Sequence, residues 1–222
     1  MLKLFIDTAT QVGSIALFKD NELLGEKIFD ERLRHLKILH TEINELMKKN
    51  SIDIKQIELI GVDIGPGSFT GIRIGVTTAR TLAQLNNSYI EGIPSLDIMK
   101  NSYQSETDYI CAVMDAKKNR VFAALYERDA RITDYLDIEP AELKKIVDRF
   151  APASPVTFIG DGGLKYESEL KTINGEAVFI QDLFPTAKFI NKILSEKNSF
   201  NREYENVKPF YLRKSDAEIN KK

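Results

Sequence analysis

Short apolar or alternating runs, separated by turn residues, open both halves of the chain. The runs lie at residues 2–7, 14–18, 23–29, 109–115, 121–126 and 132–138. Alternation of apolar and polar residues with a period of two is typical of half-buried strands. Each half is therefore predicted to begin with a three-stranded meander.

Helix-like and further strand-like segments follow each meander. Apolar spacing predicts helices over residues 31–49, about 72–85, 141–150 and 187–195, with shorter ones after Pro94 and around Glu167. Further strands are predicted at residues 59–63, 89–90, 156–159 and 177–180. Both halves thus follow the order βββαβαβα.

The repeated order predicts an α/β protein of two lobes, residues 1–104 and 105–222. A three-stranded meander extended by right-handed parallel crossovers gives a mixed sheet with helices on its faces. We expect this arrangement twice, as a duplication of topology rather than of sequence.

Composition narrows the possible functions. The chain has 222 residues and a net charge of −2, so it has no positive field for tight RNA binding on its own. The single Cys111 excludes an internal disulfide. Residues 1–6 lack the features of a signal peptide, and no stretch reaches the ~20 apolar residues of a membrane span. We therefore expect a cytoplasmic protein without membrane contact.

Four aspartates, Asp7, Asp63, Asp115 and Asp161, stand at or just past the ends of predicted strands. Open α/β sheets place their ligands at this edge. In a kinase of this topology, such carboxylates hold a metal-nucleotide and activate an acceptor hydroxyl. The alternative is structural, because aspartate is also common in turns and helix caps.

A glycine-rich turn at residues 65–71 connects a predicted strand to the next helix. Its sequence allows a sharp turn, and Ser68 or Thr70 can cap the helix. The turn could hold an anion at the start of the helix, but it lacks the ending of a P-loop and the spacing of a dinucleotide motif. A purely structural turn is the alternative.

Small residues recur every four positions along that helix, at Gly71, Gly75, Ala79 and Ala83. Each glycine costs about 1 kcal/mol of helix stability relative to alanine. The pattern predicts that another backbone approaches this face closely. The neighbour could be the chain's own sheet, its first helix or a second chain.

The first helix carries a seam of leucine and isoleucine with 3-4-3 spacing, at Leu36, Leu39, Ile43 and Leu46. This spacing is typical of a helix that pairs with another helix. It is also compatible with a helix that only packs on its own sheet.

The segments LFIDTAT, GPGSFTGIRIGVTTARTLA, MDAKKNRVFAALY and KPFYLRKS together resemble the TsaB (YeaZ) family across nearly the whole chain. The resemblance implies an actin-like (ASKHA, ribonuclease H-like) fold. It also implies a non-catalytic subunit that dimerises with TsaD through helices of the N-terminal lobe and helps to recruit TsaE. The assembly transfers threonylcarbamoyl from threonylcarbamoyl-AMP to the adenosine next to the tRNA anticodon.

On this hypothesis the chain has no catalytic residue of its own, and the N-terminal helices form a docking surface. The expected contact residues are Leu36, Leu39, Ile43, Leu46, Arg73, Val76 and Arg80. Without its partner the same surface could form a homodimer. The resemblance further implies that ATP and metal belong to the partner subunits, with none tightly bound by this chain, and that tRNA is contacted only through the complex.

Two sequence features agree with a non-catalytic role. The only histidines, His35 and His40, are five residues apart and so point about 140° apart on a helix, which does not suit a shared metal ion. Thr8, Ala9 and Thr10 follow Asp7 where actin-like kinases usually have glycine. The alternatives are an actin-like small-molecule or acyl-phosphate kinase using Asp7 and Asp63, and, less well supported, a metallopeptidase.

Overall fold

The computed structural model describes residues 1–30, 35–181 and 183–213. By packing, the chain divides into two units. Unit 1 comprises Met1–Ile98 and Pro185–Phe210, and unit 2 comprises Met99–Phe184 and the segment that begins at Tyr211. The sequence-based lobes 1–104 and 105–222 differ from these units chiefly at Pro185–Phe210, which packs with unit 1 although it follows unit 2 in the chain.

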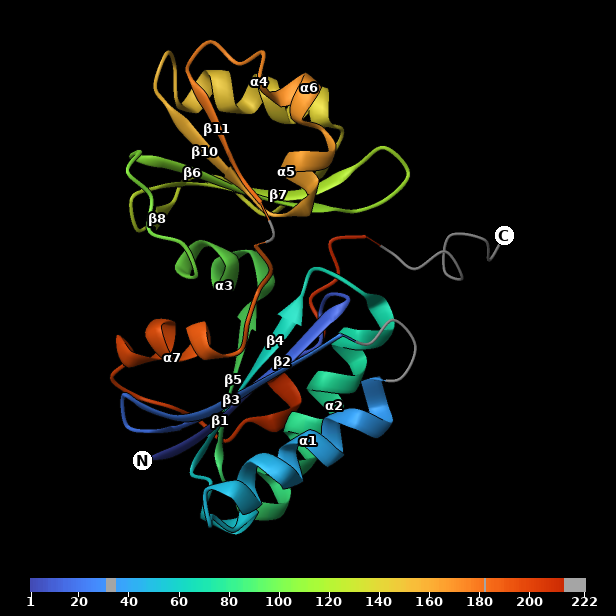
Figure 1. Cartoon of the computed structure of the whole chain (residues 1–222), viewed down its shortest axis with the longest axis vertical. Helices are drawn as coiled ribbons and strands as arrows, with labels where there is room; N and C mark the ends of the chain where they lie inside the picture. The colour runs from blue at the N-terminus through green and yellow to red at the C-terminus, as the bar shows by residue number, and fades with distance from the viewer. Residues whose placement is uncertain (31–34, 182, 214–222) are drawn as a thin grey trace. The chain divides into compact units, whose positions relative to one another are not determined.

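Unit 1 is built on a mixed five-stranded sheet (Figure 1). Its strands are β1 (Leu2–Asp7), β2 (Val12–Lys19), β3 (Glu22–Asp30), β4 (Leu59–Gly65) and β5 (Tyr89–Pro94). The order is β3-β2-β1-β4-β5, with an antiparallel meander β1–β3 and with β4 and β5 parallel to β1. The predicted meander with parallel crossovers is confirmed.

Helices cover both faces of this sheet (Figure 1). They are α1 (His35–Lys49), α2 (Phe69–Asn86), α7 (Lys188–Ser195) and the first half of α3 (Ser95–Asn101), whose last three residues belong to unit 2. Leu4 and Ile6 of β1 face α1 and α2, whereas Phe5 between them faces α7. Burying each such side chain stabilises the fold by about 1.5–3 kcal/mol, so two separate cores hold unit 1 together.

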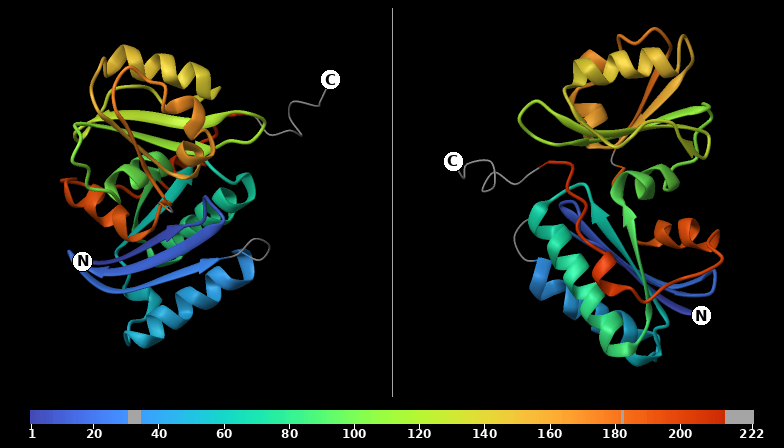
Figure 2. Two further views of the ribbon diagram at one scale, coloured as in Figure 1. Left: turned by 45° about the horizontal axis from the view of Figure 1, so that its top comes forward. Right: turned by 180° about the vertical axis from the view of Figure 1, so that it is seen from behind.

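Unit 2 repeats the topology (Figure 2). Its strands are β6 (Tyr109–Asp115), β7 (Val121–Glu127), β8 (Ala130–Arg131), β9 (Leu136–Ile138), β10 (Val156–Ile159) and β11 (Ala177–Ile180), and its helices are α4 (Pro140–Phe150), α5 (Asp161–Lys165) and α6 (Glu167–Leu170). The order is β11-β10-β6-β7-β8, and β9 also pairs with β7. The sheet and the helices share one core around Phe158, Leu143 and Val147.

The prediction of a single strand over residues 132–138 was wrong. The structure has two short strands instead, β8 and β9, with irregular backbone between them. The amide of Leu125 donates to the side-chain Oγ1 of Thr133 at 3.0 Å rather than to a neighbouring carbonyl, which interrupts the strand ladder. Helix α5 and two single-turn 3₁₀ helices, at Ile54–Gln56 and Tyr204–Asn206, were not predicted.

The duplicated order of strands and helices confirms the predicted α/β fold with two mixed sheets flanked by helices. Residues 31–34 of the first predicted helix lie outside the described residues, and α1 is observed from His35. Within the described part of the chain, we find no helix with the length and apolar character needed to cross a bilayer.

Candidate functional site

The small residues of α2 face the end of β1. A Cβ atom on Gly71 would lie 2.0 Å from the carbonyl oxygen of Thr8, and one on Gly75 would lie 2.4 Å from Thr8 Oγ1. The Thr8 hydroxyl also donates to the Gly71 carbonyl at 2.7 Å. Ala79 and Ala83 continue the stripe into the core of unit 1. The close neighbour predicted from the sequence is therefore the chain's own sheet.

Most of the predicted docking residues lie inside unit 1, which corrects the sequence-based surface. Leu39, Ile43, Leu46 and Val76 are at most 3% exposed and pack between the sheet and the helices. The 3-4-3 seam is thus a packing face, as the alternative interpretation held. Leu36 belongs to α1, but its side chain lies outside the described residues.

The two arginines of that predicted surface remain accessible. Arg73 is exposed and its guanidinium carbon lies 3.9 Å from the centre of the Phe69 ring, while Arg80 is half-buried. Their proposed contact with a partner stays a prediction.

A groove of about 350 Å³ lies between α1 and α2 on the outer face of unit 1. It is lined by His40, Arg73, Ile74, Thr77, Thr78, Thr81 and Leu82. Leu85 lies one turn beyond Thr81 on α2 and is 78% exposed, although exposing a leucine is unfavourable. Apart from His40 and Arg73, the lining consists of hydroxyl and apolar side chains along one helix face, which fit another helix better than a small charged ligand.

The glycine-rich turn is filled by neighbouring backbone. A Cβ on Gly67 would lie 2.2 Å from the Ala9 carbonyl, and the amide of Ser68 donates to that same carbonyl at 2.7 Å. Ser68 caps α2 by accepting from the Gly71 amide at 3.2 Å, as predicted. The turn therefore has a structural explanation in its contact with the segment after β1.

Asp7 and Asp63, at the ends of adjacent parallel strands, lie together in the core of unit 1. Both are fully buried. Burial raises the pKa of Asp7 well above that of an ordinary carboxyl group, and the neighbouring Asp63 raises it further. Burial likewise raises the pKa of Asp63 to about 6, against the hydrogen bonds that it accepts from Ser95 and Gly65.

In unit 2 the corresponding residue Asp115 is paired with two cations, and Asp161 accepts from its amide. Asp115 accepts from Lys117 at 2.6 Å and from Lys165 at 2.9 Å, and its amide donates to Asp161 at 3.0 Å. Burial alone would raise the pKa of Asp115, but the hydrogen bonds from the two lysines outweigh it and lower the pKa. The structure thus brings Asp115 and Asp161 together, as it does Asp7 and Asp63.

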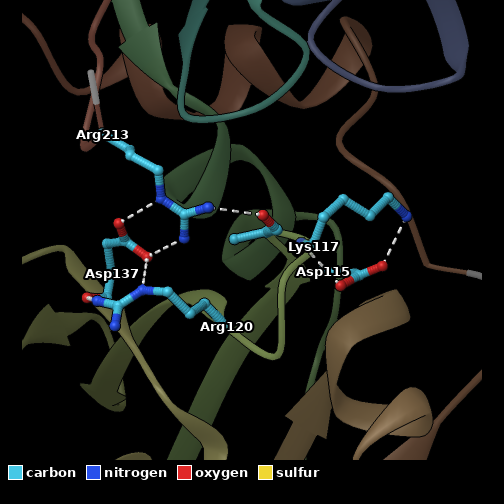
Figure 3. A network of polar contacts seen from close by, with 6 residues as sticks. Asp115, Lys117, Arg120, Asp137 and Arg213 are labelled. Atoms are coloured by element: carbon cyan, nitrogen blue, oxygen red, sulfur yellow. Dashed lines mark hydrogen bonds and ion pairs between the residues drawn. The ribbon is translucent and has the colours of Figure 1, made fainter. Parts of the chain in front are cut away.

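Asp137 is the central acceptor of a second ion-pair network, which lies beside Asp115 (Figure 3). Arg213 donates to both carboxylate oxygens of Asp137, at 2.8 and 2.6 Å, and to the Ala116 carbonyl at 3.1 Å. Arg120 donates to the same carboxylate at 2.8 Å. Burial would raise the pKa of Asp137, but the two arginines lower it.

A metal-binding cluster is not evident in the described residues: no three His, Cys, Asp or Glu side chains gather in a way that could hold an ion. His40 lines the α1–α2 groove, while the side chain of His35 lies outside the description. That the two histidine side chains point in different directions and do not share a metal ion therefore stays a prediction.

Two features of these sites were missed from the sequence. The exposed ridge Arg73, Thr77, Thr81 and Leu85 has the same four-residue spacing as the small-residue stripe and lies on another face of α2, so the spacing could have revealed it. The ion pair of Asp137 and Arg213 joins residues that are 76 positions apart in the sequence. No local sequence pattern could have predicted it.

Comparisons with known proteins agree on one family. A family profile described as "TsaD: tRNA N6-adenosine threonylcarbamoyltransferase" matches residues 30–180. The TsaB tRNA threonylcarbamoyladenosine biosynthesis protein of Bacillus subtilis is 27% identical over 98% of this chain and 96% of its own length. The TsaB protein of Escherichia coli is 29% identical over 57% of this chain and 55% of its own.

Solved structures support the fold. A protein from Pseudomonas aeruginosa described as similar to the peptidase YEAZ superimposes with a TM-score of 0.82 and 20% identity, covering 96% of this chain and 99% of its own. A ROK family protein from Streptococcus pneumoniae superimposes with a TM-score of 0.51 and 8% identity, covering 88% and 99%. At these identities the likeness concerns the fold alone.

Proposed function

The chain belongs to the TsaD family and, within it, to the TsaB/YeaZ group, and on this premise we propose that it serves tRNA threonylcarbamoyladenosine synthesis as a non-catalytic subunit. In this role it dimerises with TsaD and helps to recruit TsaE. Threonylcarbamoyl then passes from threonylcarbamoyl-AMP to the adenosine next to the anticodon. The chain holds the assembly together, while ATP and metal are bound by the other subunits.

The observation that carries this proposal is the α1–α2 groove with its exposed rim. Leu85 stands out at 78% exposure, and the apolar residues Ile74 and Leu82 of the same helix line the groove. A contact with a partner helix would remove this apolar surface from water, at about 25 cal/mol for each Å². The docking surface therefore consists of Arg73, Thr77, Thr81, Leu82 and Leu85 rather than the buried seam of α1.

The burial of the strand-end carboxyls supports the non-catalytic role over the kinase alternative. A general base must reach the proton that it abstracts. Asp7 and Asp63 are fully buried, and the contacts of Gly67 with Ala9 and of Gly71 with Thr8 close the turn beside them. A substrate hydroxyl would have to displace these contacts to reach either carboxyl.

The test is binding to TsaD from the same organism, measured by co-elution and calorimetry. Leu85→Asp places a charge on the most exposed apolar residue of the proposed contact, at the C-terminal end of α2, while leaving the core intact, and we expect at least about tenfold weaker binding. A matched control is Phe150→Asp, which changes a 40% exposed apolar residue on α4 of unit 2 and should bind normally. Ile43→Asp is unsuitable, because Ile43 is 3% exposed and the change would unfold unit 1.

Enzyme activity separates the two hypotheses. Omitting the chain from a mixture of TsaD, TsaE, threonylcarbamoyl-AMP and tRNA should stop modification, and the chain alone should transfer nothing. Turnover by the isolated chain, or Mg²⁺-ATP binding that Asp7→Asn abolishes, would favour the kinase instead. Equal TsaD binding by the Leu85→Asp variant and the unmodified protein would exclude this surface.

A further inference from the structure

Two carboxyl groups lie side by side at the ends of β1 and β4. The strands run parallel with Ile6 opposite Val62, so Asp7 and Asp63 occupy the next paired positions. Neighbouring strands are about 4.8 Å apart, and paired residues point to the same face of the sheet. That face is the one covered by α7, because Phe5, two residues before Asp7, packs there.

The hydrogen bonds of the pair leave one oxygen atom unsatisfied. Asp7 accepts from the Ala9 amide at 2.9 Å and, more weakly, from the Ser14 hydroxyl at 3.4 Å. Asp63 Oδ1 accepts from the Gly65 amide at 2.7 Å and from Ser95 at 2.6 Å. Asp63 Oδ2 is buried and has no donor among the described residues. A buried acceptor without a donor is strongly unfavourable.

The charged groups on the surrounding elements do not neutralise the pair. Asp97 of α3 adds a further negative charge near Asp63. Lys3, on the same face of β1, donates to Asn191 of α7 at 2.9 Å, and Lys188 of α7 pairs with Glu26 at 3.1 Å. Among the described residues, no cation is a main cause of the pKa shift of either carboxyl group. Two adjacent buried carboxylates would therefore repel each other without compensation.

We propose that Asp7 keeps its proton at neutral pH and donates a hydrogen bond through it to Oδ2 of Asp63, so that a shared proton, rather than a metal ion, joins the ends of β1 and β4. The proton lies on Asp7 because Asp63 receives two short hydrogen bonds that stabilise its charged form, whereas Asp7 receives one short and one long. This assignment supplies the missing donor to Asp63 Oδ2 with no added ligand. It does not depend on the proposed docking to TsaD.

The shared proton makes the stability of unit 1 depend on pH. In the unfolded chain Asp7 loses its proton near the ordinary carboxyl pKa of 3.8, whereas in the folded chain it keeps the proton to a much higher pH. Folding therefore takes up a proton in this window. The stability contribution is fully present at low pH and declines as the pH rises toward the raised pKa of Asp7.

The experiment measures local opening of β1 and β4 by hydrogen exchange in the full-length protein, from about pH 5.5 to pH 8. In the unmodified protein the opening constant, corrected for the intrinsic exchange rate, should rise up to about tenfold per pH unit. In Asp7→Asn the rise above about pH 7, where Asp63 with its pKa of about 6 is already charged, should disappear, because the amide N–H replaces the proton donor. In Asp115→Asn, which changes the corresponding strand end of unit 2, the rise at β1 and β4 should remain.

A second measurement needs no substitution. The ¹³C carboxyl resonance of Asp7 should stay at the position of a protonated acid at neutral pH, while that of Asp63 reports a carboxylate. A charged Asp7 at neutral pH would overturn the proposal, as would an opening constant with the same pH dependence in Asp7→Asn as in the unmodified protein. Added Mg²⁺ that suppresses opening only when Asp7 is present would show that a cation binds there instead.

Discussion

Units 1 and 2 share one topology but stabilise the ends of their strands in opposite ways. In unit 1 Asp7 and Asp63 are buried together, and their pKa values are raised. In unit 2 the equivalent residue at the end of β6, Asp115, is paired with Lys117 and Lys165, and its pKa is lowered. The same strand-end aspartate is thus favoured as an acid in one unit and as a carboxylate in the other.

The comparison shows that topology does not determine the chemistry of a strand end. Both units place a helix after the strand that is parallel to their central strand, and a glycine of that helix lies against the end of the central strand. Gly71 lies against Thr8 in unit 1, and Gly162 lies against Met114 in unit 2. The local cations, which unit 2 has and unit 1 lacks around its described pair, decide the protonation state.

The largest expected effect comes from blocking this close approach. Gly71→Ala would place a Cβ atom 2.0 Å from the Thr8 carbonyl, whereas Gly162→Ala would place one 2.7 Å from the Met114 carbonyl carbon. We expect unit 1 to lose about 3 kcal/mol or more of its free energy of unfolding, and unit 2 about 1–2 kcal/mol. Urea unfolding followed by hydrogen exchange in each unit measures both. Equal losses would remove this difference between the units.

An intermediate effect is expected when the acceptor of the arginine pair is removed. Asp137→Ala leaves Arg120 and Arg213 without their shared carboxylate and should destabilise unit 2 by about 2–3 kcal/mol. Asp137→Asn keeps one acceptor oxygen and should cost less. Thermal unfolding of the two variants tests this order, which would be contradicted if the asparagine variant were the less stable one.

The smallest effect concerns acid and the exposed lysine pairs. The pKa values of Asp115 and Asp137 are lowered, so their contribution to stability is fully present above the ordinary carboxyl pKa of 3.8 and declines as the pH falls below it. Unit 2 should therefore lose protection of β6 amides in acid. Protection of these amides that rises in acid would contradict the lowered pKa values.

The substitution Asp115→Asn alone should cost less than about 1 kcal/mol of stability at neutral pH, because Lys117 and Lys165 are largely exposed.

Much of the fold could be predicted because the chain repeats one local pattern. Strand alternation and helical spacing identified the first meander, the first two strands of the second and the four main helices, since these periods follow from backbone geometry. The prediction of a strand at residues 132–138 was wrong because the Thr133 side chain competes with the backbone for the Leu125 amide. A hydroxyl acting in this way does not alter the apolar pattern.

The candidate docking site was less predictable than the fold. The 3-4-3 seam of Leu39, Ile43 and Leu46 describes any helix with an apolar face, and periodicity does not say whether a sheet or a second chain covers it. The structure places these residues in the core. Leu85 was overlooked because a single exposed leucine on a surface is common.

The place of α7 in the chain has a consequence for synthesis on the ribosome. One face of the first sheet, around Phe5 and Phe18, is covered by Ile190 and Leu194, which are translated after almost all of unit 2. Domains generally fold as units during translation. We therefore expect the nascent amino-terminal half to emerge with a bare apolar sheet face, one that a chaperone can bind, until α7, in about the last sixth of the polypeptide, is made.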